Sequence, residues 1–282
     1  MGGQVSASGN FQSCGTNADW MSALCPLLWD VPLHHLSIPG SHDTMTYCLD
    51  KKSPIAQSQS RLLQLLGKVL PCITRPFVLK WSTTQVRGAG AACFHRGAHR
   101  RDPGSLQGRK NVQITFTLTL DTLTEISEWL ESHPQEVVIL ACRDFDGLTD
   151  NLHEYLVACI NNIFGDMLCP RGVGRAPLAQ VGGRSTIHQQ HPWGHALPLL
   201  PVPGGLFVAG INLTENLTYI LAHPSESLEK MTLPNLPYLR AWVREQCPGP
   251  GVRCTNIIAG DFIGTDTFVS DVIRLNDKLL RC

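Results

Sequence analysis

Short apolar runs alternate with amphipathic stretches along most of this chain, and this alternation limits the folds open to it. Residues 136–142 (EVVILAC) form a continuous apolar run, which is typical of a strand buried on both faces of a sheet. Strand followed by helix, repeated, indicates a parallel sheet with crossover helices, so an α/β fold is expected. The other predicted strands are 31–37, 205–211 and 255–260, of which 205–211 is also expected to be buried. The predicted helices are 60–70, 122–133, 149–164, 236–246 and 267–280.

Two of the predicted helices have specific local signals. Thr122 and Glu125 match a capping box, so a helix is expected to begin there and to end before Pro134. The helix over 149–164 has one apolar face, whose side chains are expected to point inward: Leu152, Tyr155, Leu156, Cys159, Ile160 and Ile163.

Length and composition exclude several classes of protein. The chain has 282 residues, enough for one large α/β barrel or two small domains. Its net charge is zero, which gives no indication of a nucleic-acid partner. No apolar run approaches the roughly 18 residues that span a bilayer, and the first 20 residues lack the apolar core of a secretory signal. Eleven cysteines without metal-ligand spacing favour a reduced, cytoplasmic protein.

The first residues carry a separate signal. Residues 1–6 (MGGQVS) fit the pattern for N-myristoylation, with Gly2 as the acceptor. Residues 1–19 are expected to be flexible. A single acyl chain holds a protein to a membrane only marginally, so peripheral membrane contact is the corresponding expectation.

The run Leu36–Met45 (LSIPGSHDTM) is the strongest functional signal. A short apolar stretch ends in Pro-Gly, and Ser41, His42 and Asp43 follow at once. This order places a histidine at the end of a predicted strand with a carboxylate next to it. Histidine has the unperturbed pKa nearest to physiological pH, so His42 is a candidate general base.

The same run resembles the signature of phosphatidylinositol-specific phospholipase C X domains, which read G-S-H-[DN]-[ST] at this point. The resemblance extends over about 1–84, 118–170 and 204–282 and is strongest to vertebrate proteins in which the X domain stands without other phospholipase C modules. It implies a TIM-type (β/α) barrel over residues 20–282, expected to be incomplete in this chain, with the active site at the carboxyl ends of the strands.

The resemblance also implies roles for individual residues. His42 corresponds to the family's catalytic base, and Asp261 to a strand-end acid that orients it. Asp43, the third expected catalytic residue, matches the acid of the metal-free branch and replaces the Asn of the calcium-dependent branch. Arg143 stands where that branch has a metal-binding Glu. A cation at Arg143 would repel Ca²⁺ and bind phosphate instead, so no metal cofactor is expected.

Two segments depart from the family pattern. Residues 85–117 and 171–204 are rich in Gly, Pro, Ala, Arg and His and show no period, so they are expected to lack helix or strand of useful length. The family's second catalytic histidine and its phosphate-binding arginine are not recognisable there. The available histidines, none on a strand-like run, are His95, His99, His188, His191 and His195. Alternative splicing, a shifted reading frame or a faulty gene model accounts for such segments, and ordinary divergent loops are the alternative.

These observations predict a phosphoric diester hydrolase of the phosphatidylinositol phospholipase C type, impaired in this form. The expected partner is a membrane phosphoinositide, and the expected state is a monomer. The alternative is a catalytically inactive, membrane-associated regulatory module produced by splicing. A third possibility is an incomplete chain that folds poorly, because a barrel that loses inner strands exposes sheet edges.

Overall fold

The described strands pair in parallel, in two separate sheets. The computed structural model describes residues 17–42, 44, 61–82, 111–142, 149–169, 176–181, 184–189, 205–213, 217–264 and 267–281. Within these ranges one sheet has the order β1-β5-β4, with β1 (Ile38–Ser41), β5 (Ile257–Gly260) and β4 (Val208–Gly210). The other sheet pairs β2 (Val137–Cys142) with β3 (Arg184–Gln189). The predicted parallel α/β arrangement is confirmed, whereas the described strands do not by themselves form a closed barrel.

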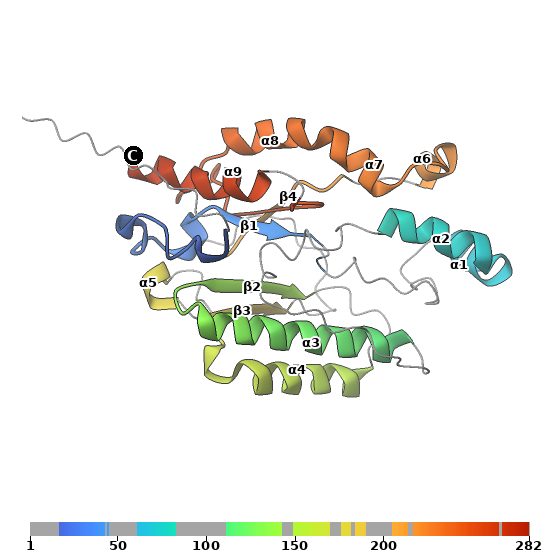
Figure 1. Ribbon diagram of the computed structural model, residues 1–282, viewed down its shortest axis with the longest axis horizontal. Coiled ribbons are helices and arrows are strands. Elements are labelled where there is room, and N and C mark those ends of the chain that lie inside the picture. Colours follow the sequence, from blue (N-terminus) through green and yellow to red (C-terminus); the bar gives the residue numbers. More distant parts are fainter. Residues whose placement is uncertain are drawn as a thin grey trace, which may run out of the picture.

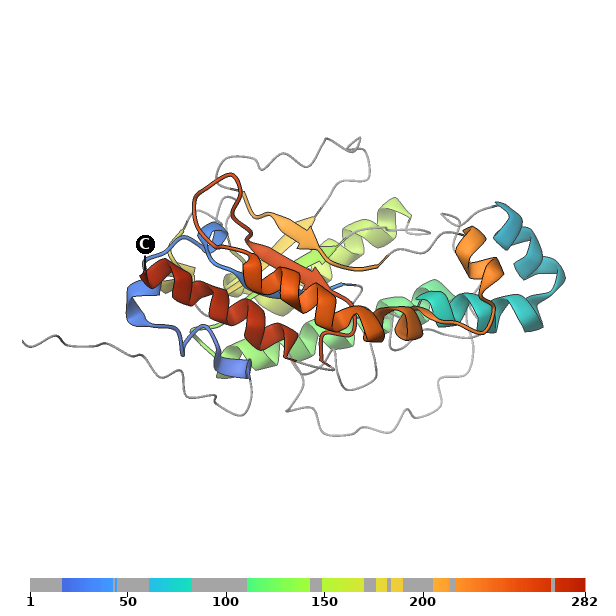
Figure 2. The ribbon, with the colours of Figure 1, turned by 90° about the horizontal axis from the view of Figure 1, so that it is seen from above.

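Helices lie along both sheets and project beyond one end of them. In Figures 1 and 2, α8 and α9 run along the β1-β5-β4 sheet, and α1, α2 and α6 project together at the end toward which the strand arrows point. None of the helices in the described part of the chain is both long and apolar enough to cross a bilayer. The bounds are α1 (Arg61–Val69), α2 (Pro71–Ser82), α3 (Asn111–Ser132), α4 (Asp150–Phe164), α5 (Leu178–Val181), α6 (Leu217–Ala222), α7 (Leu228–Thr232), α8 (Leu236–Glu245) and α9 (Phe268–Arg274).

The largest apolar cluster joins the two sheets near the amino ends of their strands. Ile38 of β1, Ile257 of β5 and Val137 of β2 all belong to it, together with apolar residues of the N-terminal turns. Those turn residues are Met21, Leu24, Leu28, Leu33 and Leu36. Burying one such side chain contributes about 1.5–3 kcal/mol, so this cluster is a major link between the sheets. Separate clusters pack α8 and α9 on β5, and α3 and α4 on β2.

Two buried asparagines fix the chain just before β1. The amide of Asn276 accepts the N–H of Ser37 at 2.8 Å and donates to the Ser37 carbonyl at 2.9 Å. Asn256 donates to the carbonyls of Leu33 and Leu36 at 2.8 and 2.7 Å. These bonds satisfy backbone groups that a turn leading into a strand leaves without ladder partners. The position of β1 therefore depends on residues near the other end of the chain.

A buried carboxylate joins α8 to α9. Asp271 on α9 accepts hydrogen bonds from Arg240 and Arg244 of α8 and from Thr267. Burial alone raises the pKa of Asp271, but the hydrogen bonds from Arg244, Arg240 and Thr267 outweigh it and leave the pKa below its usual value. The carboxylate is therefore ionised at neutral pH, and α9 stays against α8 over the sheet that contains β1.

Several predicted elements differ from those observed. The strand expected over 31–37 is wrong: Leu33–His35 forms a 3₁₀ turn after Pro32, and the strand begins at Ile38. The capping box at Thr122 does not begin a helix, because α3 already starts at Asn111, inside the segment expected to lack structure. Thr124 lies inside this helix and donates to the Leu120 carbonyl.

Other differences concern burial and the second unusual segment. Tyr155, expected to point inward, is 55% exposed, and Val208 in β4 is 45% exposed although its strand was expected to be buried. The expectation that 171–204 holds no strand is wrong, because β3 pairs with all six residues of β2. Confirmed elements include α1, β2, α4, β5, α8 and the end of α3 before Pro134. The structure adds that Thr149 caps α4, since its hydroxyl accepts the Leu152 N–H.

Candidate active site

The carboxyl ends of β1 and β5 lie side by side. Ser41 is paired with Gly260, and the next N–H along β1, that of His42, donates to the Gly260 carbonyl at 3.0 Å. Gly40 allows this close pairing: a Cβ there would lie 3.1 Å from the Ala259 Cβ and 3.2 Å from Cγ2 of Ile257. The Pro-Gly of the motif thus brings the two strands close enough for the residues that follow them to meet.

His42 and Asp261 form a hydrogen-bonded pair at this edge. Nδ1 of His42 lies 2.9 Å from Oδ1 of Asp261. Because an ionised carboxylate only accepts, Nδ1 holds the proton, and in the neutral ring the basic lone pair is then on Nε2. The histidine side chain is 26% exposed and the carboxylate 1% exposed. A buried acid that orients a partly exposed imidazole is the arrangement needed for a general base.

The residue after Asp261 has an unusual backbone. Phe262 has φ of 53°, the left-handed region that residues with a side chain rarely adopt. Its ring is fully buried in a cluster with Trp81 of α2 and Leu228 of α7. Strain of this kind persists only where the surrounding packing fixes it, and such positions concentrate at functional sites. The packing of Phe262 therefore holds the chain at the point where Asp261 turns toward His42.

A further polar contact lies in the turn after β1, whereas the other predicted site residues are outside the described part of the chain. The hydroxyls of Ser41 and Thr44 hydrogen-bond to each other across the turn that follows β1. Asp43, Arg143 and Gly2 lie outside the described residues. Among the described residues, no group of three or more His, Cys, Asp or Glu side chains is placed to hold a metal ion.

One of the five remaining histidines is on a strand after all. His188 lies near the carboxyl end of β3, in register with Ala141 of β2. The sequence interpretation, that none of these histidines sits on a strand-like run, is therefore wrong for His188. Its strand, RSTIHQ, is too polar to stand out by apolar periodicity. His95, His99, His191 and His195 lie outside the described residues.

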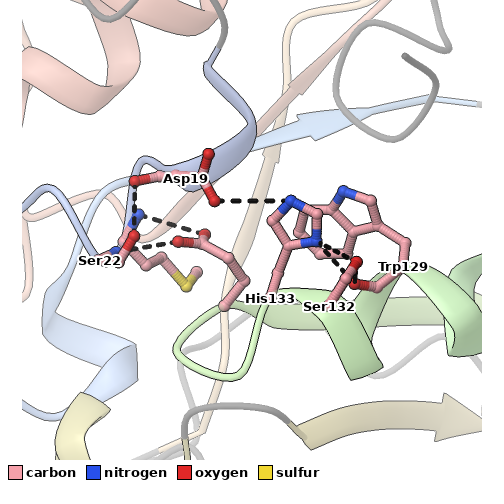
Figure 3. Close-up of polar contacts among 7 residues, drawn as sticks. Asp19, Ser22, Trp129, Ser132 and His133 are labelled. Carbon is pink, nitrogen blue, oxygen red and sulfur yellow. Dashed lines mark hydrogen bonds and ion pairs between the residues drawn. The ribbon is translucent and has the colours of Figure 1, made fainter. Parts of the chain in front are cut away.

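A second polar cluster lies at the opposite, amino end of β2 and was not predicted. Buried Glu136 accepts the backbone N–H groups of Ser22 at 2.9 Å and Met21 at 3.2 Å. His133 Nε2 lies 3.5 Å from the Asp19 carboxylate, and His133 Nδ1 lies 2.7 Å from the Trp129 carbonyl (Figure 3). These contacts anchor the N-terminal turns to α3 and β2. No sequence motif marks it.

The substitution Glu136→Gln is expected to reduce the pH dependence of the free energy of unfolding. Burial is the main cause that raises the pKa of Glu136 above its ordinary value of 4.5, and the N–H groups of Ser22 and Met21 only partly oppose it. The folded state therefore binds this proton more tightly than the unfolded state, so the wild type loses stability as pH rises from 4.5 to the raised pKa. The glutamine variant has no such loss. Urea unfolding between about pH 4 and 8 measures the free energy of unfolding of both proteins. If the two free energies changed with pH in the same way, the prediction would be contradicted.

The described fold is similar to that of a solved bacterial protein. Phosphatidylinositol-specific phospholipase C from Listeria monocytogenes superimposes with a TM-score of 0.53 at 18% identity, covering 93% of this chain and 99% of the bacterial one. The fold is therefore that of the phosphatidylinositol-specific phospholipases C. No protein-family model matches the sequence.

Curated relatives then define the family. The human PI-PLC X domain-containing protein 1 is 60% identical, with the alignment covering all of both chains. The mouse protein of the same name is 52% identical over 94% of this chain and 88% of its own, and the zebrafish one 36% identical over 87% and 92%. The chain belongs to the family of PI-PLC X domain-containing proteins.

In the alignment with the human relative, this chain has many gaps. It extends over 324 positions, whereas the chain has 282 residues, so at least 42 of those positions face gaps here. Because the alignment covers both chains completely, these gaps are internal to the alignment.

Proposed function

We propose that this chain is a phosphoric diester hydrolase of the phosphatidylinositol-specific phospholipase C type, with His42 as its general base. The observation that carries the proposal is the hydrogen bond from His42 to the buried Asp261, formed where two adjacent parallel strands end. Family membership and the phospholipase C-like fold support the reaction class. The proposed substrate is a membrane phosphoinositide.

His42 has a defined part in the proposed reaction. Nε2 of His42 removes the proton from the inositol 2-hydroxyl, and the resulting oxygen attacks the adjacent phosphorus in line. The bond from phosphorus to the diacylglycerol oxygen breaks, and that oxygen must take up a proton as it leaves. The products are diacylglycerol and a cyclic inositol phosphate. Asp261 keeps Nδ1 protonated and stabilises the imidazolium that forms on His42.

The form described here is proposed to be impaired. A second acid must protonate the leaving oxygen, and this step contributes about 10²–10⁴-fold. The 42 or more positions that face gaps against the human relative support the view that segments needed for this step are absent. The same gaps favour the second candidate function, a catalytically inactive regulatory module that keeps the fold of the family.

The activity is expected to be independent of calcium. Asp43 and Arg143 are proposed to occupy the positions at which calcium-dependent relatives bind the ion, and a guanidinium repels Ca²⁺. Treating an active form with a strong chelator should therefore leave the rate of phosphatidylinositol cleavage unchanged. Loss of cleavage that is restored by millimolar Ca²⁺ would show that a metal ion occupies the site.

Product analysis tests the reaction type directly. Purified protein is incubated with vesicles that contain phosphatidylinositol, and phosphorus NMR follows the appearance of the five-membered cyclic phosphate. A cyclic product that appears before the open monophosphate supports attack by the 2-hydroxyl. If neither this chain nor a form completed at the gapped positions releases any inositol phosphate, the proposed function is wrong and the regulatory module is favoured.

A further inference from the structure

Exposed apolar side chains gather on one short part of the molecule. Five of the fourteen large apolar side chains exposed in the described residues lie within twelve consecutive positions of α1 and α2. They are Leu62, Leu65, Val69, Leu70 and Ile73, exposed by 49–69%. Single exposed apolar residues are normal on any protein surface, whereas a concentrated patch marks an interaction site.

Helix geometry places these side chains together. Leu62, Leu65 and Val69 follow one another by three and four positions, so they share one face of α1. The corner between the helices is fixed by Thr74, whose buried hydroxyl donates to the carbonyls of Leu66 at 3.1 Å and Leu70 at 2.9 Å. Leu70 lies between the two helices and Ile73 in the first turn of α2, so both follow directly on that face of α1.

A third helix extends this end of the molecule. Tyr219 of α6 meets the Trp81 ring of α2 edge to face at 6.1 Å, and Leu221 of the same helix is 57% exposed. Figures 1 and 2 both show α6 beside α1 and α2 at the end toward which β1 and β5 point. The apolar surface therefore has support from the body of the protein through α2.

The charges of this region have one sign. Residues 61–82 contain Arg61, Lys68, Arg75 and Lys80 and no aspartate or glutamate. Apolar side chains flanked by cations fit an anionic lipid surface, where the apolar groups enter the acyl boundary and the cations remain among the headgroups. A second copy of the chain fits less well, because a two-fold contact would bring the same cations together without an acid to pair with.

The surface is connected to the candidate active site. Trp81 near the end of α2 packs in the same cluster as Phe262, the residue that follows Asp261. A membrane contacting α1 would therefore lie on the side of the molecule where β1 ends at His42.

We propose that the α1–α2 surface, formed by Leu62, Leu65, Val69, Leu70 and Ile73 with Arg61 and Lys68 beside them, docks this protein on anionic membranes. The docking gives the proposed function a membrane contact but does not depend on catalysis. It also does not need an acyl chain on Gly2, since the surface is part of the folded domain.

Vesicle sedimentation with unacylated full-length protein tests the proposal without any substrate. The vesicles contain phosphatidylcholine with roughly one third phosphatidylserine and no phosphatidylinositol. Leu65→Asp combined with Ile73→Asp is expected to weaken binding by about tenfold or more. The matched control is Leu27→Asp combined with Val252→Asp, which changes two other exposed side chains, 75% and 94% exposed, near the amino ends of the strands.

A charge variant tests the electrostatic part separately. Arg61→Gln combined with Lys68→Gln is expected to weaken binding about thirtyfold at low salt, whereas the exposed pair Arg253→Gln and Arg281→Gln is expected to change it little. Binding of the wild type should also fall as NaCl rises from about 0.1 to 0.5 M. Circular dichroism of each variant verifies that it is folded.

The outcomes separate membrane docking from the proposed catalysis. Binding that is lost in both surface variants, kept in both controls and kept in His42→Ala supports membrane docking whatever the catalytic result. Absent binding, or equal binding by surface and control variants, overturns it. A dimer in lipid-free solution that Leu65→Asp with Ile73→Asp dissociates, without vesicle binding, also overturns it and assigns the surface to a second copy.

Discussion

Replacing His42 by alanine is expected to abolish phosphatidylinositol cleavage in any active form of this protein. The variant lacks the base whose ring is hydrogen-bonded to the buried acid Asp261, and general base catalysis contributes about 10²–10⁴-fold. The side chain is partly exposed, so its loss is expected to lower the melting temperature by only a few degrees. Release of cyclic inositol phosphate, followed over time at matched protein concentration, measures the effect.

Two further substitutions separate catalysis from structure. His42→Asn keeps an N–H donor for Asp261 but provides no base, so it should be as inactive as alanine while keeping more of the stability. Asp261→Ala should reduce the rate by less than His42→Ala, because it removes the orienting group and leaves the imidazole in place as proton acceptor. Retained turnover in His42→Ala would remove His42 from the mechanism.

Completing the chain is expected to have the second large effect. A chimaera that carries the human relative's residues at the 42 or more gapped positions should cleave phosphatidylinositol about 10²–10⁴-fold faster than the unaltered chain. The reason is that leaving-group protonation and stabilisation of the phosphoryl oxygens both need groups that are not recognisable in this sequence. Initial rates of the two proteins on the same vesicles give the comparison.

The control for this comparison is the chimaera with His42→Ala, which should be inactive. Equal rates for the unaltered chain and the chimaera would mean that a histidine already present supplies the acid. His188 on β3 would then be substituted first, followed by His95 and His99, and the interpretation as an impaired form would be abandoned.

Helices and strands were predicted correctly where the local sequence pattern agrees with the tertiary packing. The run at 136–142 and the Pro71 that ends α1 have one clear interpretation each, and both match the structure. The first strand was displaced because the apolar residues Leu33 and Leu36 are buried in a 3₁₀ turn, held there by Asn256. Apolarity predicted their burial correctly, but the hydrogen bonds of a residue more than 200 positions away decided their conformation.

The candidate site shows the same limits. His42 and Asp261 were identified from a motif and a strand end, and the structure adds the hydrogen bond between them. Phe262 could not have been singled out, because a left-handed φ at a phenylalanine arises from tertiary packing and leaves no local signature. The polar strand β3 was missed for a related reason. Its sequence has no apolar pattern, and only its pairing with β2 in the folded chain shows that it is a strand.

The long-range ties to β1 have a consequence for synthesis of the protein. His42 and Asp261 are 219 positions apart, and Asn276 holds Ser37 from even nearer the end of the chain. At roughly 5–20 residues per second, the N-terminal motif emerges from the ribosome roughly 10–40 seconds before its partners. During that time β1 has no parallel neighbour, and its apolar residues are accessible to chaperones. A nascent chain interrupted before β5 would carry the complete histidine motif and still lack the strand and the acid that complete the site.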